Sequence, residues 1–471
     1  MPRRRPASYD NHRLAMRLPS TLIRLMTIVS LAVVTPMHAE DADPSHWPGF
    51  RGPDAGGVAA GQVTPTHWSV ENHQHIKWKT PINGLGHSCP VVWGDRVFVT
   101  TAMREEGLAE LRAGIYGDIA PVDNNTSVSW LLYCLDRITG QIIWQRTAHA
   151  GVPIIKRHPK SSHANPTPAT DGTHVVAFFG SEGIYCYDFA GQLLWRKNLG
   201  VLDSGYFRVP TAQWGFASSP VIHDGRLVLQ CDVQDGGFLA VLDVDDGKEI
   251  WRTSRKDVPT WSTPAVYVGR GAAQIIVNGF RHIGAYDLDS GNPRWQLTGG
   301  GDIPVPTPIV AHDLIYITNA HGGLAPIYAV RIEAEGDVTP GSKGAKAFLA
   351  WYEDRGGNYM QTPIVIGTWL YLCTDGGVVS CRDATSGRLH YRQRLPERSG
   401  YTASPVATTD HIYFTSENGH VVVLATGPTY QWIATNDLGE PCLATPAIAN
   451  GELIFRTRHH VIAVGRDETG R

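Results

Sequence analysis

The chain has 471 residues, of which 18% are charged, and its formal net charge at pH 7 is −3. This slightly acidic balance excludes a protein whose main partner is the phosphate backbone of nucleic acid, because such proteins present a basic surface. The 50 glycines and 14 tryptophans favour many short strands joined by tight turns.

Residues 1–39 have the pattern of a secretory signal peptide. Six arginines accompany a short apolar run over residues 25–34, and Ala39 offers a small residue for cleavage. The run is too short for a membrane-spanning helix of about 20 residues, and no cysteine follows directly that could carry a lipid anchor. We expect a periplasmic or secreted protein without an integral membrane span. An uncleaved anchor is the alternative, and Met16 is an alternative start.

Residues 40–73 show no repeat and are expected to form an N-terminal extension, whereas two short patterns alternate along residues 74–471. The first is a Ser or Thr next to, or one residue before, a proline that opens an apolar run. Its prolines are Pro90, Pro168, Pro220, Pro264, Pro308, Pro363, Pro405 and Pro446. The second is an aromatic residue in a short strand after a turn with Asp and Gly. Its aromatic residues are Trp78, Trp144, Trp195, Trp251, Trp295, Trp351, Tyr391 and Trp432.

The repeat over residues 262–297 illustrates the unit. Strands are expected over residues 262–268, 274–278, 283–287 and 293–297, and a turn of Asp, Ser, Gly and Asn precedes the last of them. The most regular copies are 41 to 44 residues apart. A repeat of this length with four strands is typical of a propeller blade.

The two series predict an all-β, eight-bladed β-propeller of four-stranded antiparallel blades. Trp78 precedes the first proline of its series, and no aromatic strand follows Pro446. We therefore expect the N-terminal strand around Trp78 to be the outer strand of the last blade and to close the ring, which removes exposed sheet edges. Seven blades plus an unrelated end segment is the alternative.

Three insertions lengthen the minimal repeat, over residues 102–128, 147–164 and 333–347. A short helix could form over residues 102–112. Long loops on a rigid scaffold often carry binding residues, and surface decoration is the alternative. The seven cysteines include no C-x-x-C pair and mostly lie in apolar strand runs, so we expect them to be buried small hydrophobic residues.

The turn from Asp136 to Gly140 followed by Trp144, and its copy before Trp295, resemble the repeats of the PQQ-binding-like propellers. This group, also called quinoprotein alcohol dehydrogenase-like, includes a BamB-like subgroup. The resemblance runs from about residue 74 to 465, and residues 47–53 resemble the opening of exported PQQ-repeat proteins. It implies that the eight aromatic residues of the second series dock blade on blade, which is a structural role.

A quinoprotein dehydrogenase of this family would hold PQQ with Ca²⁺ in the funnel, through Glu, Asn and Asp ligands, an Asp base and adjacent cysteines. No two cysteines are adjacent here and no haem-attachment C-x-x-C-H is present. We expect no cofactor, and PQQ with Ca²⁺ is the alternative. The pairs His73/His75 and His459/His460 are interpreted as structural, and residues 156–160, which are basic, as a solvated loop rather than an anion site.

In a propeller, the link from each outer strand to the next inner strand ends at the mouth of the central funnel. Residues just before the proline openers are therefore the predicted ligand-binding residues, and inter-blade packing is the alternative for about half of them. They are His87, His163, Gln213, Trp214, Trp261, Asp302, Asn358, Tyr359, Tyr401 and Glu440. This mixture of aromatic and polar groups suits peptides, glycans or flat ligands.

Because the repeat ring is complete and no catalytic set is recognisable, the sequence favours a non-catalytic binding or scaffolding propeller of the cell envelope. A PQQ-dependent oxidoreductase acting on alcohols or sugars is one alternative, and a glycan-binding propeller is another. The expected partners are envelope or exported proteins, a glycan or a small ligand. The protein is expected to be a monomer.

Overall fold

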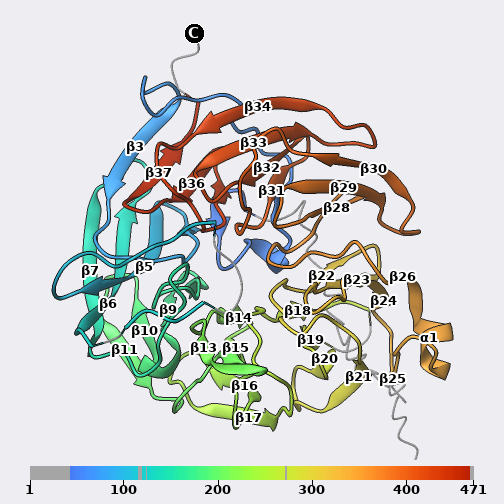
Figure 1. Ribbon diagram of the computed structural model, residues 1–471. Coiled ribbons are helices and arrows are strands. Elements are labelled where there is room, and N and C mark those ends of the chain that lie inside the picture. The colour runs from blue at the N-terminus through green and yellow to red at the C-terminus, as the bar shows by residue number, and fades with distance from the viewer. Residues whose placement is uncertain (1–42, 115–118, 124, 271–272, 467–471) are drawn as a thin grey trace, which may run out of the picture. The chain divides into compact units, whose positions relative to one another are not determined.

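The computed structural model describes residues 43–114, 119–123, 125–270 and 273–466, so the predicted signal segment lies outside the described residues. Eight sheets of four or five strands form a ring around a central channel (Figure 1). The predicted eight-bladed, all-β propeller is confirmed. Six of the eight blades consist of four strands that are consecutive in the chain. In blade 5 a short strand that pairs with blade 4 intervenes before the outer strand, and blade 8 takes its outer strand from the N-terminal part of the chain.

From the inner to the outer strand, blades 1 to 4 are: β4 (Val91–Trp93), β5 (Arg96–Arg104), β6 (Val128–Asp136), β7 (Ile142–Gly151); β8 (Ala169–Thr170), β9 (His174–Phe178), β10 (Ile184–Asp188), β11 (Leu193–Lys197); β14 (Val221–His223), β15 (Arg226–Cys231), β16 (Phe238–Asp243), β17 (Glu249–Ser254); β18 (Ala265–Tyr267), β19 (Gln274–Val277), β20 (Ile283–Asp287), β21 (Pro293–Leu297). Blades 5 to 8 are: β22 (Ile309–Ala311), β23 (Leu314–Thr318), β24 (Ile327–Arg331), β26 (Leu349–Glu353); β27 (Ile364–Ile366), β28 (Trp369–Cys373), β29 (Val378–Asp383), β30 (Leu389–Arg394); β31 (Val406–Thr408), β32 (His411–Thr415), β33 (His420–Ala425), β34 (Trp432–Asp437); β35 (Ala447–Ala449), β36 (Glu452–Arg456), β37 (His460–Val464), β3 (Ile76–Pro81).

The N-terminal strand β3 closes the ring as predicted. It pairs antiparallel with β37, and Trp78 lies opposite Ala463. Blade 8 therefore takes one strand from the start of the chain and three from its end, which excludes the seven-blade alternative. In Figure 1 the blue β3 lies beside the red β37.

Short elements decorate this ring. β1 (His46–Trp47) adds to β4, and β2 (Val58–Ala59) adds to β31. β12 (Gly205–Tyr206) and β13 (Val209–Gln213) form a separate hairpin. In the blade 5 insertion, β25 (Gly336–Asp337) runs parallel to β21, and α1 (Lys343–Phe348) follows it. The helix expected over residues 102–112 is wrong for the described structure, because β5 extends to Arg104 and no helix follows it in the described part of that insertion.

Five aromatic residues of the second series share one contact with the next blade. Their indole Nε1 donates to a carbonyl oxygen in that blade's turn, at 2.7 to 3.0 Å. The pairs are Trp78 with Arg137, Trp144 with Phe189, Trp195 with Val244, Trp251 with Leu288 and Trp351 with Ala384. The turn glycine permits this approach. At Gly247, for example, φ is +69° and an added Cβ would lie 2.7 Å from the Trp195 ring.

Three members of the series differ. Trp295 is buried, but its Nε1 has no hydrogen-bond partner among the described residues. Tyr391 packs edge-on against Tyr430, with 5.7 Å between ring centroids. Trp432 is 53% exposed, which corrects its expected docking role. Its neighbour, blade 8, receives its outer strand from the other end of the chain, so no Asp-Gly turn is there to accept the indole.

All seven cysteines lie in the described part of the chain, and each is buried and unpaired. Burial raises the pKa of the Cys134, Cys186 and Cys442 thiols to about 12. They therefore behave as small hydrophobic residues. None of the helices in the described residues has the length and apolar character needed to cross a membrane.

Candidate functional site

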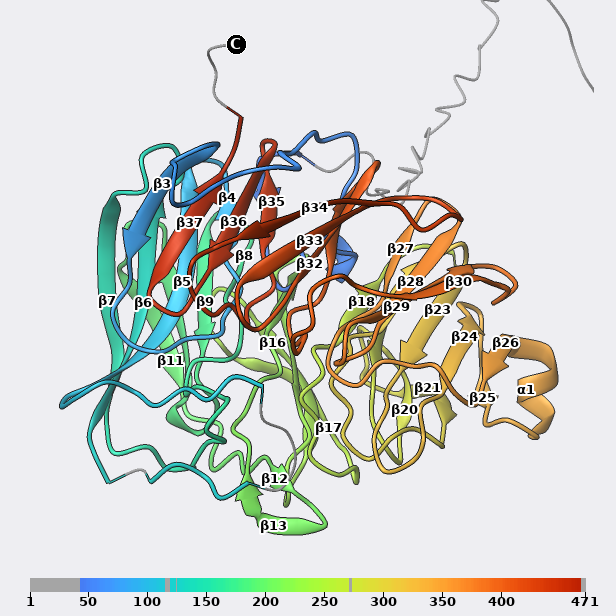
Figure 2. The same ribbon diagram turned by 45° about the horizontal axis from the view of Figure 1, so that its top comes forward.

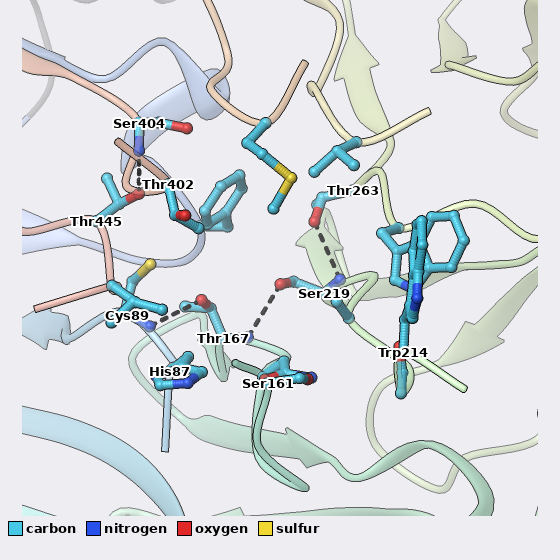
Figure 3. Close-up of a pocket in the computed structure, with 18 of the residues that line it drawn as sticks. His87, Cys89, Ser161, Thr167, Trp214, Ser219, Thr263, Thr402, Ser404 and Thr445 are labelled. Carbon is cyan, nitrogen blue, oxygen red and sulfur yellow. Dashed lines mark hydrogen bonds between the residues drawn. The ribbon is translucent and has the colours of Figure 1, made fainter. Parts of the chain in front are cut away.

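The links from outer to inner strands surround one end of the channel, which we call the funnel face. A cavity of about 220 Å³ opens there (Figure 3). Its lining comes from all eight links that lead into the inner strands and from one residue of the N-terminal extension, Phe50. In Figure 2 the β12–β13 hairpin projects on one side of the ring.

Four of the ten predicted ligand-binding residues line this cavity: His87, Trp214, Trp261 and Tyr359. Trp214 lies between two other aromatic rings. It stacks on Tyr206 with 5.4 Å between centroids, and its centroid is 5.1 Å from that of Trp261. Trp261 is held in turn by a 2.8 Å hydrogen bond from its Nε1 to the Gly215 carbonyl. One side of the mouth is therefore an aromatic wall.

Asp302 does not line the cavity but organises its rim. Its carboxylate accepts a 2.9 Å hydrogen bond from the Tyr206 hydroxyl, and it lies 2.6 Å from both His321 Nδ1 and Arg208 Nε. Burial alone would raise the pKa of Asp302, but these hydrogen bonds and charges lower the pKa below its usual value. His321 also stacks on Tyr359, 5.4 Å between centroids. The cluster therefore positions the aromatic wall.

Asn358 and Tyr401 lie outside the lining because they are used for packing. Both are buried, and they hydrogen-bond to the backbone carbonyls of Gln361 and Glu397, respectively. Prolines open the strands that follow them, but the link folds their side chains between the blades.

The last three predicted residues also lie outside this cavity. His163 is beside Trp130 in a second, much smaller cavity. Gln213 donates to Asp203 at 2.8 Å. Glu440 accepts the backbone N–H of His459 at 2.7 Å and lies 2.5 Å from His460 Nδ1.

A ring of small polar residues was missed by sequence reasoning, although it lies inside the repeat pattern itself. We call it the collar. It consists of the residues immediately before the eight proline openers: Cys89, Thr167, Ser219, Thr263, Thr307, Thr362, Ser404 and Thr445. Seven of them line the cavity, and Thr307 does not.

Collar residues link successive blades. The hydroxyl oxygen of each of six members accepts the backbone N–H of the preceding member at 2.9 to 3.0 Å, as Thr167 does from Cys89 and Thr445 from Ser404 (Figure 3). Because an inner strand that begins at proline leaves the preceding N–H without a ladder partner, a hydroxyl at this position satisfies it. This explains why Ser or Thr accompanies proline in the repeat.

The N-terminal extension closes the opposite end of the channel. Residues 47–57, which we call the plug, cross it from blade 1 to blade 7. The Pro48 carbonyl accepts from Thr170 in blade 2, and the Gly57 carbonyl accepts from Ala407 in blade 7. The plug is the blue segment at the centre of Figure 1. The cavity is therefore blind, with Phe50 at its base.

The guanidinium of Arg51 holds the plug in place. It donates to the carbonyls of Pro363 and Pro405 at 3.0 and 2.6 Å, and to two carbonyls of the plug itself. Arg51 is fully buried. Burial lowers its pKa to about 9.

The basic segment over residues 156–160 is not a solvated loop, which corrects that expectation. Arg157, His158 and Lys160 are all buried. Lys160 Nζ lies 2.5 Å from Glu417 Oε1, and the other oxygen of Glu417 accepts the Gly114 N–H at 2.6 Å. Burial raises the pKa of Glu417, but Lys160 and the hydrogen bonds outweigh burial and lower the pKa below its usual value, so the carboxylate stays ionised.

His87 enters the cavity as a neutral group. Its Nε2 lies 3.0 Å from the Lys160 carbonyl. Burial lowers its pKa to about 3, and the charges of Arg157, Arg456 and Arg458 act in the same direction. His87 can therefore serve as a hydrogen-bonding group at neutral pH and carries no charge there.

The cavity does not provide the ligand set that PQQ with Ca²⁺ requires. Calcium takes six to eight oxygen ligands, with carboxylates prominent among them, but no Asp or Glu is among the described residues that line the cavity. In the same described ranges, no group of three or more His, Cys, Asp or Glu side chains is arranged to hold a metal ion. The pairs His73/His75 and His459/His460 therefore belong to no such group.

Residues 128–337 and 350–471 match the family model of the outer membrane protein assembly factor BamB, a PQQ-repeat family. No curated protein matches the chain. Among solved structures, BamB from Moraxella catarrhalis is 14% identical, with a TM-score of 0.51 over 77% of this chain and 98% of its own.

Two dehydrogenases have the same fold. Quinohemoprotein alcohol dehydrogenase from Comamonas testosteroni is 11% identical, with a TM-score of 0.58 over 91% of this chain and 82% of its own. A europium-containing methanol dehydrogenase is 12% identical, with a TM-score of 0.57 over 90% of both chains. At such identities these likenesses show the fold alone. By its repeats and its match to the family model, the chain belongs to the PQQ-repeat β-propeller family of the assembly factor BamB.

Proposed function

We propose that this protein is a non-catalytic binding and scaffolding propeller of the cell envelope, which presents its funnel face to a partner. The observation that carries the proposal is the blind cavity with an aromatic wall. It has the polar and apolar lining of a binding site but no carboxylate that could act as a base on a ligand within it. The match to an assembly factor supports a protein partner.

The funnel face offers an extended surface for such a partner. The β12–β13 hairpin carries Phe207 and Arg208, and the Arg208 guanidinium lies over the Phe207 ring at 5.2 Å. Phe207 also contacts Phe280, 5.6 Å between centroids. Aromatic and Arg side chains on a rigid support are the groups that most often dominate binding energy at protein interfaces.

Site-specific photocrosslinking tests the proposal. A benzophenone amino acid at Phe207 should give an adduct of defined mass with an envelope protein in cells. The matched control is the same substitution at Ile250, which is 49% exposed on the outer strand β17 and should give none. Equal adducts at both positions, or none at either, would contradict the proposal.

The quinoprotein alternative predicts a different result with purified protein. The two dehydrogenase structures support this alternative only in that they share the fold. After incubation with PQQ and Ca²⁺ and removal of free ligand, we expect no dye reduction with alcohols or sugars. Retained absorbance together with dye reduction would replace the scaffolding proposal with an oxidoreductase.

A further inference from the structure

Four of the six collar hydroxyls that line the cavity have an unused donor. Thr167, Ser219, Thr263, Thr362, Ser404 and Thr445 are each at most 3% exposed. Their oxygens are occupied as acceptors of backbone N–H groups, so each keeps one O–H to donate. The hydroxyls of Thr167 and Thr445 hydrogen-bond the Cys89 side chain. For the O–H groups of the other four, Ser219, Thr263, Thr362 and Ser404, no acceptor is found among the described residues. Buried polar hydrogens without an acceptor are costly, and these converge on one space.

A positive charge adjoins the collar, although the Arg51 side chain does not itself line the cavity. Arg51 donates to the carbonyls of Pro363 and Pro405, which follow the collar residues Thr362 and Ser404 in the chain. All of its hydrogen-bond partners in the described structure are backbone carbonyls, and it forms no ion pair there. A buried guanidinium without a carboxylate favours an anion nearby.

The rest of the cavity adds no negative charge and much apolar surface. Lys160 lines the rim, and no Asp or Glu does so among the described residues. The apolar lining includes Phe50, Trp214, Trp261, Ile303, Val305 and Leu443. A fully hydrated inorganic anion would leave this surface without a partner, whereas an organic anion can cover it.

We propose that the collar binds a small organic anion, an apolar body that carries a carboxylate. The carboxylate accepts collar O–H donors near Arg51, and the body lies against Phe50 and the aromatic wall. The two oxygens of a carboxylate offer about four acceptor positions, so adjacent blades can serve the same group. This inference rests on the proposed binding function and names the ligand class of its cavity.

Calorimetric titration of the full chain with three probes tests the ligand class. Benzoate is the test anion, benzamide is its neutral counterpart of nearly the same shape, and inorganic phosphate is an anion without an apolar body. We expect benzoate to bind and benzamide to bind at least tenfold more weakly. Phosphate binding as tight as benzoate, benzamide binding as tight as benzoate, or no benzoate binding would overturn the proposal.

A matched set of variants places the site at the collar. Thr362→Val removes a lining hydroxyl and should weaken benzoate binding about tenfold, whereas Thr362→Ser keeps the hydroxyl and should bind as the parent does. Thr307→Val is the control, because Thr307 occupies the same collar position in blade 5 but does not line the cavity. Equal weakening by Thr307→Val and Thr362→Val, or weakening by Thr362→Ser, would overturn the assignment.

The two proposals fail separately. Benzoate binding without crosslinks from Phe207 would leave the anion site standing and remove the scaffolding function. Crosslinks without benzoate binding would do the reverse. Thermal unfolding of each variant shows whether the collar still joins its blades, and Thr362→Ser preserves the test if Thr362→Val does not fold.

Discussion

The indole Nε1 of Trp78 donates a 2.7 Å hydrogen bond to the carbonyl oxygen of Arg137. Trp78 lies in blade 8 and Arg137 in blade 1, so the bond crosses the seam at which the N-terminal strand closes the ring. The Arg137 guanidinium crosses the same seam to Glu452 Oε2, at 2.6 Å. Both contacts are buried, so closure depends on packing as well as on the β3–β37 ladder.

Trp78→Ala should destabilise the protein by about 3–5 kcal/mol, the usual cost of truncating a buried tryptophan. The variant loses the indole surface and leaves the Arg137 carbonyl without its donor. Urea unfolding followed by tryptophan fluorescence and circular dichroism measures the change.

Trp432→Ala is the matched control for the seam. Trp432 occupies the equivalent position in blade 7 but is 53% exposed, so its loss should change stability by less than about 1 kcal/mol. A cost as large as that of Trp78→Ala would show that exposure does not distinguish the two positions.

Gly247→Ala should cost about 2–4 kcal/mol, as the sum of backbone strain and overpacking. Its φ is +69°, and the new Cβ would lie 2.7 Å from the Trp195 ring. Gly225→Ala separates the two contributions, because Gly225 has a φ of +70° and nothing within 4 Å of its Cβ position. The two variants are compared by thermal and urea unfolding. Equal losses would mean that the tryptophan contact adds no constraint.

Glu182 makes stability depend on pH. Burial raises its pKa to about 7 from a usual value of 4.5, so the folded state holds the proton more tightly than the unfolded chain does. The resulting stabilisation is complete below about pH 4.5 and is lost as the pH rises toward 7. Glu182→Gln keeps an oxygen for the Ile154 N–H and removes the charge.

The free energy of unfolding of Glu182→Gln, relative to that of the parent, should therefore rise by about 1–3 kcal/mol between pH 4.5 and pH 8. Urea midpoints across this range measure the difference. Glu105→Gln, at an exposed position of the blade 1 insertion, is the control. Its stability should depend on pH in the same way as that of the parent. A difference that shrinks as the pH rises would refute the assigned direction.

Arg51→Lys should loosen the plug even though it keeps the charge. The planar guanidinium reaches carbonyls of blades 6 and 7 and of the plug at once, which a single ammonium cannot do in the same geometry. Hydrogen exchange of the Ala407 amide, which donates to Gly57, should quicken at least tenfold. Amides in β10 serve as the internal control, and equal acceleration there would indicate general destabilisation.

The blade count and the ring closure could be predicted from the sequence because they depend on local, repeated signals. A proline that opens an inner strand and a tryptophan after an Asp-Gly turn recur once per blade, and each acts within a few residues or on the next blade. Trp78 was assigned to the last blade by counting alone. Trp432 shows the limit, since its docking depends on a turn that the closing strand replaces.

The candidate site was decided by tertiary structure. His87, Trp214, Trp261 and Tyr359 face the cavity while Asn358 and Tyr401 pack between blades, although all precede a proline opener. The direction in which each of these side chains points depends on contacts with other loops, and no local sequence pattern encodes these contacts. The collar forms only when all eight blades meet in a ring. In the plug, Arg51 donates to carbonyls that are 312 and 354 residues away in the chain. Such contacts arise only when the ring brings distant segments together, so the sequence by itself determined the scaffold and the folded ring determined the site.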